Sequence, residues 1–309
     1  MFGKVAIVGA GGVGTAIAYA SLIRGASKEI ALYDLNAAKV EAEVLDLNHG
    51  LRFAGSSHVI GADTIDVCSD ADIVVITAGA KQRPGETRLD LAGRNADMFR
   101  EMVPALVDAA PGAVFLVVTN PVDVMTYGTL RLSGLPPSRV IGSGTVLDTS
   151  RLHYLLARRC GVDVRNIHAY IGGEHGDSEF PLWSTATVGG VPITAWTDEN
   201  GLPVSTGELD AIADEVKHAA YRIIEGKGAT TYAIGLAVTE IMQAVLTDLS
   251  RILPVSSLVD DVCLSLPSVV ARSGVTRVLD IPLSAAERAA LDASRTTIRT
   301  AIEAVGFDE

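Results

Sequence analysis

The chain has 309 residues, of which 48% are hydrophobic and 20% are charged, and its formal net charge is −12. This composition is typical of a globular protein with one large domain or two modest ones, and it excludes a disordered chain. The negative charge argues against binding to nucleic acid, which requires basic surface to replace the counterions of the phosphates. An anionic ligand would have to meet arginine or histidine that is concentrated locally.

The three cysteines, Cys68, Cys160 and Cys263, lie far apart and lack the spacing of metal ligands, so we expect buried, reduced thiols. The N-terminal segment is short and glycine-rich and has no cleavage site of small residues, which is not typical of a secretion signal. No apolar stretch approaches the ~20 residues needed to span a bilayer. We therefore expect a cytoplasmic protein without a membrane segment.

The segment KVAIVGAGGVGTAIAYASLIRG predicts a buried strand, a tight turn and a helix. Gly9, Gly11 and Gly14 form the pattern G-x-G-x-x-G in this segment. In a dinucleotide site the first glycine permits the turn, the second lets the backbone approach a pyrophosphate, and the third lets the helix pack closely on the strand. The N-terminus of the helix supplies free N–H groups for the phosphates.

A second predicted strand, EIALYD, ends at Asp34, twenty residues after Gly14. A carboxylate at this place accepts hydrogen bonds from both ribose hydroxyls of NAD and repels the 2′-phosphate of NADP. The sequence does not contain the pattern G-x-x-x-x-G-K-[ST], which excludes an NTPase of the P-loop class. The first part of the chain therefore predicts an NAD site.

Strands and helices continue to alternate after this point, with a helix expected over residues 86–109. The further strands are predicted within residues 58–63, 72–79, 113–123 and 139–144. This order predicts an α/β fold with a doubly wound parallel sheet, which binds its ligand beyond the carboxyl ends of the strands. The residues expected to line the cofactor site are Gly9, Gly11, Val13, Gly14, Asp34, Thr77, Ala78, Gly79 and Asn120.

The character of the sequence changes near residue 145, so we expect a dinucleotide-binding domain over residues 1–144 and a substrate domain over residues 145–309. A helix is predicted to begin near Leu147, and Asp148 and Arg151 are three positions apart, which places them on one helix face. The segment NIHAYIGGEHGDSEFPLW then surrounds His175 with glycines and acids.

Oxidation of an alcohol by NAD requires a group that removes the hydroxyl proton as the hydride leaves. Histidine titrates near working pH, so His175 suits this role, and Asp148 is a candidate for the carboxylate that orients it. Arg151 is a candidate anchor for a substrate carboxylate, which arginine binds with two hydrogen bonds. We expect no metal at Glu174, His175 and Asp177, because neighbouring residues of an extended chain point in opposite directions.

Six segments resemble the L-lactate/malate dehydrogenase family: GAGGVG, TAGAKQRPGETRLDLAGRN, VVTNPVDVMTY, GSGTVLDTSRLHYLL, GEHGDSE and KGATTYAIGLA. They occur in the family's order over nearly the whole chain, and the pair LDTSR and GEHGDSE is highly specific. The resemblance implies a Rossmann domain followed by an α+β substrate domain, with NAD as cofactor. It makes His175 the proton donor and acceptor, Asp148 its partner and Arg151 the carboxylate anchor. Arg88 would polarise the substrate carbonyl from a closing lid, and Asn120 would bind near the reacting centre.

The choice between lactate and malate depends, in this family, on the residue six positions before the lid arginine. That residue is Gln82, which is typical of lactate enzymes, whereas malate enzymes have arginine there to pair with a second carboxylate. Thr230, in KGATTY, fits a pocket wall that suits the methyl group of pyruvate. Arg83 lies one position from Gln82, and a one-residue shift of the lid would bring Arg83 toward the substrate. Malate dehydrogenase is therefore the alternative.

Many bacterial lactate dehydrogenases that resemble this chain are tetramers activated by fructose 1,6-bisphosphate. The histidine that meets the phosphates in them, seven positions before the catalytic histidine, is present here as His168. Their arginine, two positions after the anchor, is replaced by His153. The resemblance therefore implies a homotetramer with an effector site of histidines, and the alternative is that His153 and His168 have only structural roles.

Two other classes of protein share the glycine-rich turn. An S-adenosylmethionine-dependent methyltransferase also has an acid at the end of its second strand, and a nucleotide-binding sensor without activity retains the whole fold. Neither has a use for a set of histidine, aspartate and arginine, so the sequence favours the dehydrogenase. We expect pyruvate and lactate as its substrates.

Overall fold

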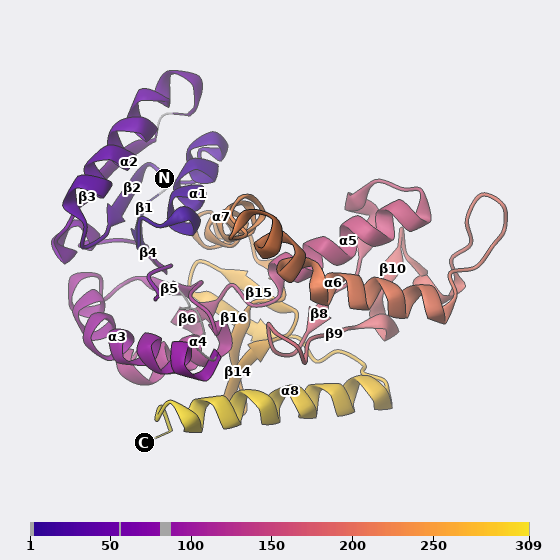
Figure 1. Cartoon of the computed structure of the whole chain (residues 1–309). Coiled ribbons are helices and arrows are strands. Elements are labelled where there is room, and N and C mark those ends of the chain that lie inside the picture. Colours follow the sequence, from indigo (N-terminus) through magenta and orange to yellow (C-terminus); the bar gives the residue numbers. More distant parts are fainter. Residues whose placement is uncertain (1–2, 56, 81–87, 309) are drawn as a thin grey trace.

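The computed structural model describes residues 3–55, 57–80 and 88–308 (Figure 1). Its first half alternates strands and helices in the predicted order. The elements are β1 (Lys4–Val8), α1 (Gly12–Arg24), β2 (Glu29–Tyr33), α2 (Ala37–His49), β3 (His58–Ala62), β4 (Ile73–Ile76), α3 (Arg88–Ala109), β5 (Val114–Val117), α4 (Val122–Ser133) and β6 (Val140–Gly142).

The second half combines four helices with short strands. Its helices are α5 (Val146–Cys160), α6 (Thr206–Lys227), α7 (Tyr232–Leu246) and α8 (Ala285–Ala304). Its strands are β7 (Ile167–His168), β8 (Ile171–Gly172), β9 (Phe180–Pro181), β10 (Thr187–Val188), β11 (Val191–Pro192), β12 (Arg251–Leu253), β13 (Ser256–Val259), β14 (Val262–Ser265), β15 (Ser268–Ala271) and β16 (Gly274–Val278).

The central sheet has eight strands in the order β14-β13-β6-β5-β4-β1-β2-β3. The six strands from the first half are all parallel, and the order reverses direction beside β1, which confirms the predicted doubly wound sheet. The sequence analysis did not foresee that β13 and β14 of the second half extend this sheet as an antiparallel pair beside β6. The two halves of the chain therefore share one sheet.

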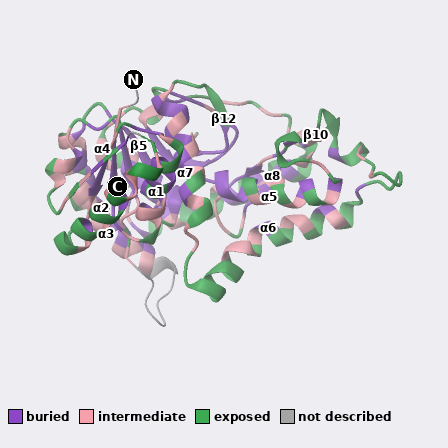
Figure 2. Ribbon diagram, turned by 90° about the horizontal axis from the view of Figure 1, so that it is seen from above, coloured by how far each residue is buried: buried purple, intermediate pink, exposed green. Residues whose placement is uncertain are grey.

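Both faces of this sheet are covered by helices, which explains its continuous apolar strands (Figure 2). Val5 and Ile7 of β1 pack in one core with residues of α1, α2 and α7. The alternate residues of the same strand, Ala6 and Val8, pack in a second core with residues of α3, α4 and α8. A third core lies between α5, α6 and the short strands of the second half. Among the residues described, no helix is both long enough and apolar enough to cross a membrane.

Helices α1 and α7 pack closely at Gly235, which is buried within α7. A Cβ atom on Gly235 would lie 2.7 Å from the carbonyl oxygen of Ala16 in α1. This contact is with backbone, so it cannot be relieved by a rotamer change, and the two helices would have to move apart. Because α1 begins at the glycine-rich turn, this contact also fixes the position of the predicted cofactor site.

Gly235→Ala is therefore expected to lower the free energy of unfolding by about 1–3 kcal/mol, the usual cost of overpacking a core. The control is Gly226→Ala in α6, where a Cβ atom meets no other atom within 4 Å. That change should be neutral or stabilising, because alanine favours a helix more than glycine does. Urea unfolding of both variants at one protein concentration tests the pair, and equal stabilities would contradict the close packing.

Candidate active site

The glycine-rich turn has the backbone shape that a dinucleotide site requires. Gly9 has a φ of 101°, and a Cβ atom there would lie 2.8 Å from the backbone nitrogen of Ala78. A Cβ atom on Gly14 would lie 1.9 Å from the carbonyl oxygen of Gly9, so only glycine fits at this helix–strand contact. Gly11 differs, because no atom lies within 4 Å of its Cβ position. That open space beside the start of α1 is suited to a pyrophosphate.

Asp34 follows β2 and faces this turn. Its Oδ2 atom accepts a hydrogen bond from the backbone N–H of Ala10 at 2.9 Å, and its Oδ1 atom accepts one from Asn36 at 3.2 Å. Each carboxylate oxygen can accept a second hydrogen bond, so both ribose hydroxyls can still bind there. Val13 is half-buried in the first turn of α1. The residues of this part of the chain thus fit NAD, and Asp34 also holds the turn in place.

The ends of β4 and β5 form the neighbouring wall of the cofactor site. Thr77 donates a hydrogen bond to the carbonyl oxygen of Gly9 at 2.9 Å, and Thr119 donates one to that of Ala78 at 2.7 Å. A Cβ atom on Gly79 would lie 2.8 Å from Thr119, so the two loops pass close together. The segment Thr77–Gly79 therefore lies against the glycine-rich turn, as the topology predicts.

A buried asparagine that the sequence analysis missed joins these loops. Asn95 of α3 accepts a hydrogen bond from the backbone N–H of Ala80 at 2.8 Å and donates one to the carbonyl oxygen of Asn120 at 2.9 Å. Asn120 itself is exposed at the end of β5, where its side chain can reach a ligand.

The structure describes only part of the predicted lid. Gln82 lies outside the described residues. Arg88 is the first residue of α3, and its side chain also lies outside the described part. Thr230 is half-buried in the short connection between α6 and α7. The roles that we expect for these three residues stay predictions.

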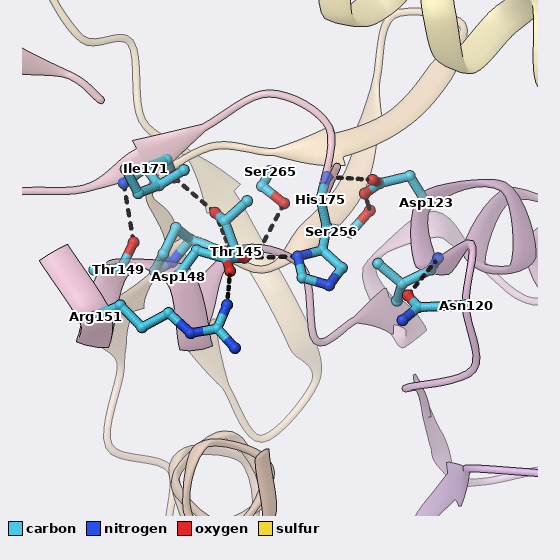
Figure 3. Close-up of polar contacts among 12 residues, drawn as sticks. Asn120, Asp123, Thr145, Asp148, Thr149, Arg151, Ile171, His175, Ser256 and Ser265 are labelled. Atoms are coloured by element: carbon cyan, nitrogen blue, oxygen red, sulfur yellow. Dashed lines mark hydrogen bonds and ion pairs between the residues drawn. The ribbon is translucent and has the colours of Figure 1, made fainter. Parts of the chain in front are cut away.

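The central feature of the site is a hydrogen-bonded chain of His175, Asp148 and Arg151 (Figure 3). The Nδ1 atom of His175 lies 2.6 Å from Oδ2 of Asp148, and Nη1 of Arg151 donates to Oδ1 of the same carboxylate at 2.5 Å. Asp148 is only 2% exposed, whereas the side chain of His175 remains 25% exposed. Because Nδ1 is occupied by Asp148, the Nε2 atom is the one left to exchange a proton with a substrate.

The charges around His175 favour its protonated form. Burial disfavours the imidazolium, but the charge and hydrogen bond of Asp148, with help from Glu179 and Asp123, raise the pKa of His175 to about 9. Burial likewise acts to raise the pKa of Asp148, and the positive charges of His175 and Arg151 outweigh it, so the pKa of this carboxyl is lowered. Asp148 therefore stays ionised between two cations.

A second buried carboxylate holds the backbone of His175. Oδ2 of Asp123, in α4, accepts a hydrogen bond from the backbone N–H of His175 at 2.7 Å, and Oδ1 accepts one from the hydroxyl of Ser256 at 2.6 Å. Burial raises the pKa of Asp123 to about 6, although both hydrogen bonds oppose this. The sequence analysis missed both partners. Asp123 lies in the quoted segment VVTNPVD, but no sequence signal marks Ser256.

Two threonines, Thr145 directly before α5 and Thr149 within it, align Asp148 with the histidine loop. Thr145 donates its hydroxyl hydrogen to the carbonyl oxygen of Ile171 at 2.6 Å, and the Thr149 hydroxyl accepts from the N–H of Ile171 at 2.9 Å. Ile171 lies in β8, directly before the loop that carries His175. The backbone C=O and N–H of Ile171 are thus both hydrogen-bonded at the N-terminal end of the helix that carries Asp148.

The acids beside His175 in sequence point to other partners. Ser178 donates a hydrogen bond to the carboxylate of Glu174, and Tyr221 donates one to that of Asp177 at 2.7 Å. Among the described residues, the group of three that could hold a metal ion is instead Asp148, His175 and Glu179. The hydroxyl of Ser294, in α8, bonds the carbonyl oxygen of Ser178 at 2.6 Å and so ties this loop to the C-terminal helix.

The proposed effector histidines lie on neighbouring elements. His168 is exposed in β7, and the Nε2 atom of His153 in α5 lies 2.7 Å from the carbonyl oxygen of Ala169. Burial lowers the pKa of His153, and the nearby His168 lowers it further, while the hydrogen bond to Ala169 opposes this. The two histidines are therefore close together, and His153 is less readily protonated than free histidine.

Two family models match the chain in sequence order. The NAD-binding domain of lactate/malate dehydrogenase matches residues 3–142, and the alpha/beta C-terminal domain of lactate/malate dehydrogenase matches residues 145–307. Together they include every residue of the hydrogen-bonded chain at His175.

Several L-lactate dehydrogenases match this chain over nearly its full length. An L-lactate dehydrogenase of Bifidobacterium animalis subsp. lactis is 49% identical over 98% of this chain and 97% of its own. An L-lactate dehydrogenase of a Synechococcus species is 50% identical over 98% of this chain and 99% of its own. A lactate dehydrogenase from a deep-sea metagenome library of the Medee basin is 41% identical in sequence. Its crystal structure matches this one with a TM-score of 0.94, covering 99% of this chain and 100% of that one. The chain is thus an NAD-dependent dehydrogenase that belongs to the lactate/malate dehydrogenase family.

Proposed function

We propose that this enzyme catalyses reversible hydride transfer between NADH and pyruvate, giving (S)-lactate and NAD+. The observation that carries the proposal is the chain from Arg151 through Asp148 to His175, which joins a carboxylate anchor to a proton donor. The names of the relatives, which are L-lactate dehydrogenases, support lactate over malate. Oxidation of NADH, followed by its absorbance with pyruvate and with oxaloacetate in parallel, tests the proposal.

In this mechanism NAD, when bound at the glycine-rich turn, supplies or accepts the hydride. Arg151 binds the carboxylate of pyruvate, which fixes the position of the carbonyl group. The Nε2 atom of His175 donates its proton to the carbonyl oxygen, and it takes the proton back from lactate in the reverse reaction. Asp148 keeps the ring in the orientation that points Nε2 at the substrate and stabilises the imidazolium.

The lid completes the site in this proposal. Arg88 supplies a positive charge beside the carbonyl oxygen, and lid closure excludes water, which strengthens that charge's effect. Asn120 donates a hydrogen bond near the reacting centre. Gln82 and Thr230 face the methyl end of pyruvate. A dicarboxylate in the same closed site would have one carboxylate left beside an uncharged amide, which costs several kcal/mol.

The wider context is also part of the proposal. We place the boundary between the cofactor and substrate domains after residue 144, and we propose that the enzyme works as a homotetramer that fructose 1,6-bisphosphate activates. The compartment that we propose is the cytoplasm, because Cys68, Cys160 and Cys263 are all free and buried.

His175→Asn is expected to reduce turnover of pyruvate by ~10² to 10⁴-fold, because a general acid–base group is lost while the nucleotide site is untouched. In the wild type, pyruvate reduction requires the imidazolium, so kcat/KM should fall as pH rises toward the His175 pKa of about 9. Lactate oxidation requires the neutral ring and should rise over the same interval. Steady-state assays, with NADH fluorescence as the binding control, test this. Near-normal turnover of the variant would exclude His175 as the proton donor.

Gln82→Arg is expected to shift the preference from pyruvate toward oxaloacetate, on the order of 10²-fold in the ratio of kcat/KM values. The new guanidinium gains a carboxylate partner with oxaloacetate and is desolvated without one when pyruvate binds. Arg83→Gln is the matched control for a charge change one position away, and it should leave the ratio close to that of the wild type. An unchanged ratio in Gln82→Arg would mean that Gln82 does not face the substrate.

Fructose 1,6-bisphosphate is expected to lower the KM for pyruvate more strongly near pH 6 than near pH 8. The reason is that its phosphates would bind imidazolium at His153 and His168, and the lowered pKa of His153 confines its charged form to acidic solution. Titration of the effector at both pH values, with His153→Ala and His168→Ala as controls, measures this. A wild-type tetramer that shows no activation at pH 6 would disprove the effector site.

A further inference from the structure

Glu179 is a buried acid of the site whose role neither the sequence nor the mechanism above explains. It directly precedes β9 and is 8% exposed. One of its carboxyl oxygens, a carboxyl oxygen of Asp148 and a ring nitrogen of His175 all lie within 4.8 Å of one another. Among the residues that the structure describes, none forms a hydrogen bond with the Glu179 carboxyl group.

This absence of hydrogen bonds separates Glu179 from the other buried acids. Asp123 accepts two hydrogen bonds, and Glu287 accepts hydrogen bonds from Ser184 and Ser284. An ionised carboxylate that is buried without hydrogen bonds is costly, so such a group tends to keep its proton. Burial and the charge of Asp148 raise the pKa of Glu179 to about 8, while His175, Arg151 and Lys217 oppose this. At neutral pH the side chain is therefore mostly the uncharged acid.

The charged groups that face Glu179 come from three directions. Asp148 and Arg151 come from α5, His175 comes from its own loop, and Lys217 comes from α6. Asp123 of α4 acts on His175 from the other side. Pyruvate brings one further negative charge to this site, its carboxylate, which is expected to bind at Arg151. An ionised Glu179 would thus be a second anion next to the place where an anion must bind.

We propose that Glu179 is a positioning residue that controls substrate binding through its own proton: as the neutral acid it admits the pyruvate anion to Arg151, and as the carboxylate it repels that anion. This inference rests on the proposed function. The competent form for pyruvate then needs two protons, one on His175 and one on Glu179. For lactate, His175 must be neutral, and the uncharged form of Glu179 again binds the anion more tightly.

The proposal fixes the shape of the pH profile. In the wild type, titration of Glu179 should add one step of about tenfold to the fall in kcat/KM for pyruvate, beside the tenfold fall per pH unit that loss of the His175 proton causes. Glu179→Gln is nearly isosteric and cannot ionise, so its profile should lack this additional step and should begin to fall at a higher pH. The difference should lie in KM, since repulsion weakens binding. One unit charge at about 6–8 Å is expected to change the affinity for an anion by on the order of tenfold.

The test compares kcat and KM for pyruvate between pH 6.5 and pH 10 in the wild type, Glu179→Gln and Glu179→Asp. Glu199→Gln is the control, because Glu199 is an exposed acid of the second half, and its profile should match that of the wild type. Glu179→Asp keeps an ionisable group and should keep the additional step. Binding of NADH, measured by fluorescence, shows that each variant is folded.

Three results would overturn the inference. A wild-type kcat/KM for pyruvate that falls tenfold per unit without the additional step of about tenfold would show that only His175 titrates, even if no variant folds. An unchanged profile in Glu179→Gln would show that the substrate does not sense Glu179. A fall that begins at lower pH in Glu179→Gln would show that the carboxylate only retains the proton of His175. Absence of pyruvate turnover in the wild type would refute the proposed function instead, so the two failures are distinguishable.

Discussion

The active site depends on two hydrogen bonds between the N-terminal end of α5 and the backbone of Ile171. Thr145 and Thr149 satisfy the C=O and the N–H of this one residue, so helix and strand cannot slide past each other without breaking both bonds. Successive side chains of an extended segment point to opposite sides, and a shift of one residue would turn the loop's side chains away. The 2.6 Å contact between Asp148 and His175 is a consequence of this register.

The three acids around His175 have different charge states because they have different partners. Asp148 lies between two cations, which keep the pKa of its carboxyl low in spite of full burial. Asp123 has hydrogen bonds from His175 and Ser256, but burial outweighs them and its pKa is raised to about 6. Glu179 has no hydrogen bond from the described residues, and burial and the charge of Asp148 raise its pKa to about 8 against the opposing charges of His175, Arg151 and Lys217. A site that carries several acids can therefore accept an anion, since burial without partners leaves part of its acid uncharged.

Local patterns in the sequence were sufficient to predict the parallel sheet and the cofactor turn, whereas the pairing of Asp148 with His175 was implied by the family resemblance. These predictions rest on residues near one another in sequence or on strand ends that must share an edge. The antiparallel extension by β13 and β14 was not predictable, because a short apolar strand has no signal that names its neighbour. Ser256 and Ser294 were not predictable for the same reason. Long-range packing brings Ser256 to Asp123 and Ser294 to the histidine loop, and no sequence pattern marks either serine.

In the proposed mechanism, Arg151 connects substrate binding with proton transfer through Asp148. Its guanidinium donates to Asp148 at 2.5 Å and partly neutralises the carboxylate that His175 needs. A substrate carboxylate competes for the same guanidinium and adds a negative charge to the site, and both effects stabilise the imidazolium. Bound pyruvate therefore strengthens the hold of His175 on its proton until the carbonyl oxygen becomes an alkoxide. Bound lactate carries the same carboxylate, which makes the neutral ring a stronger base for the hydroxyl proton.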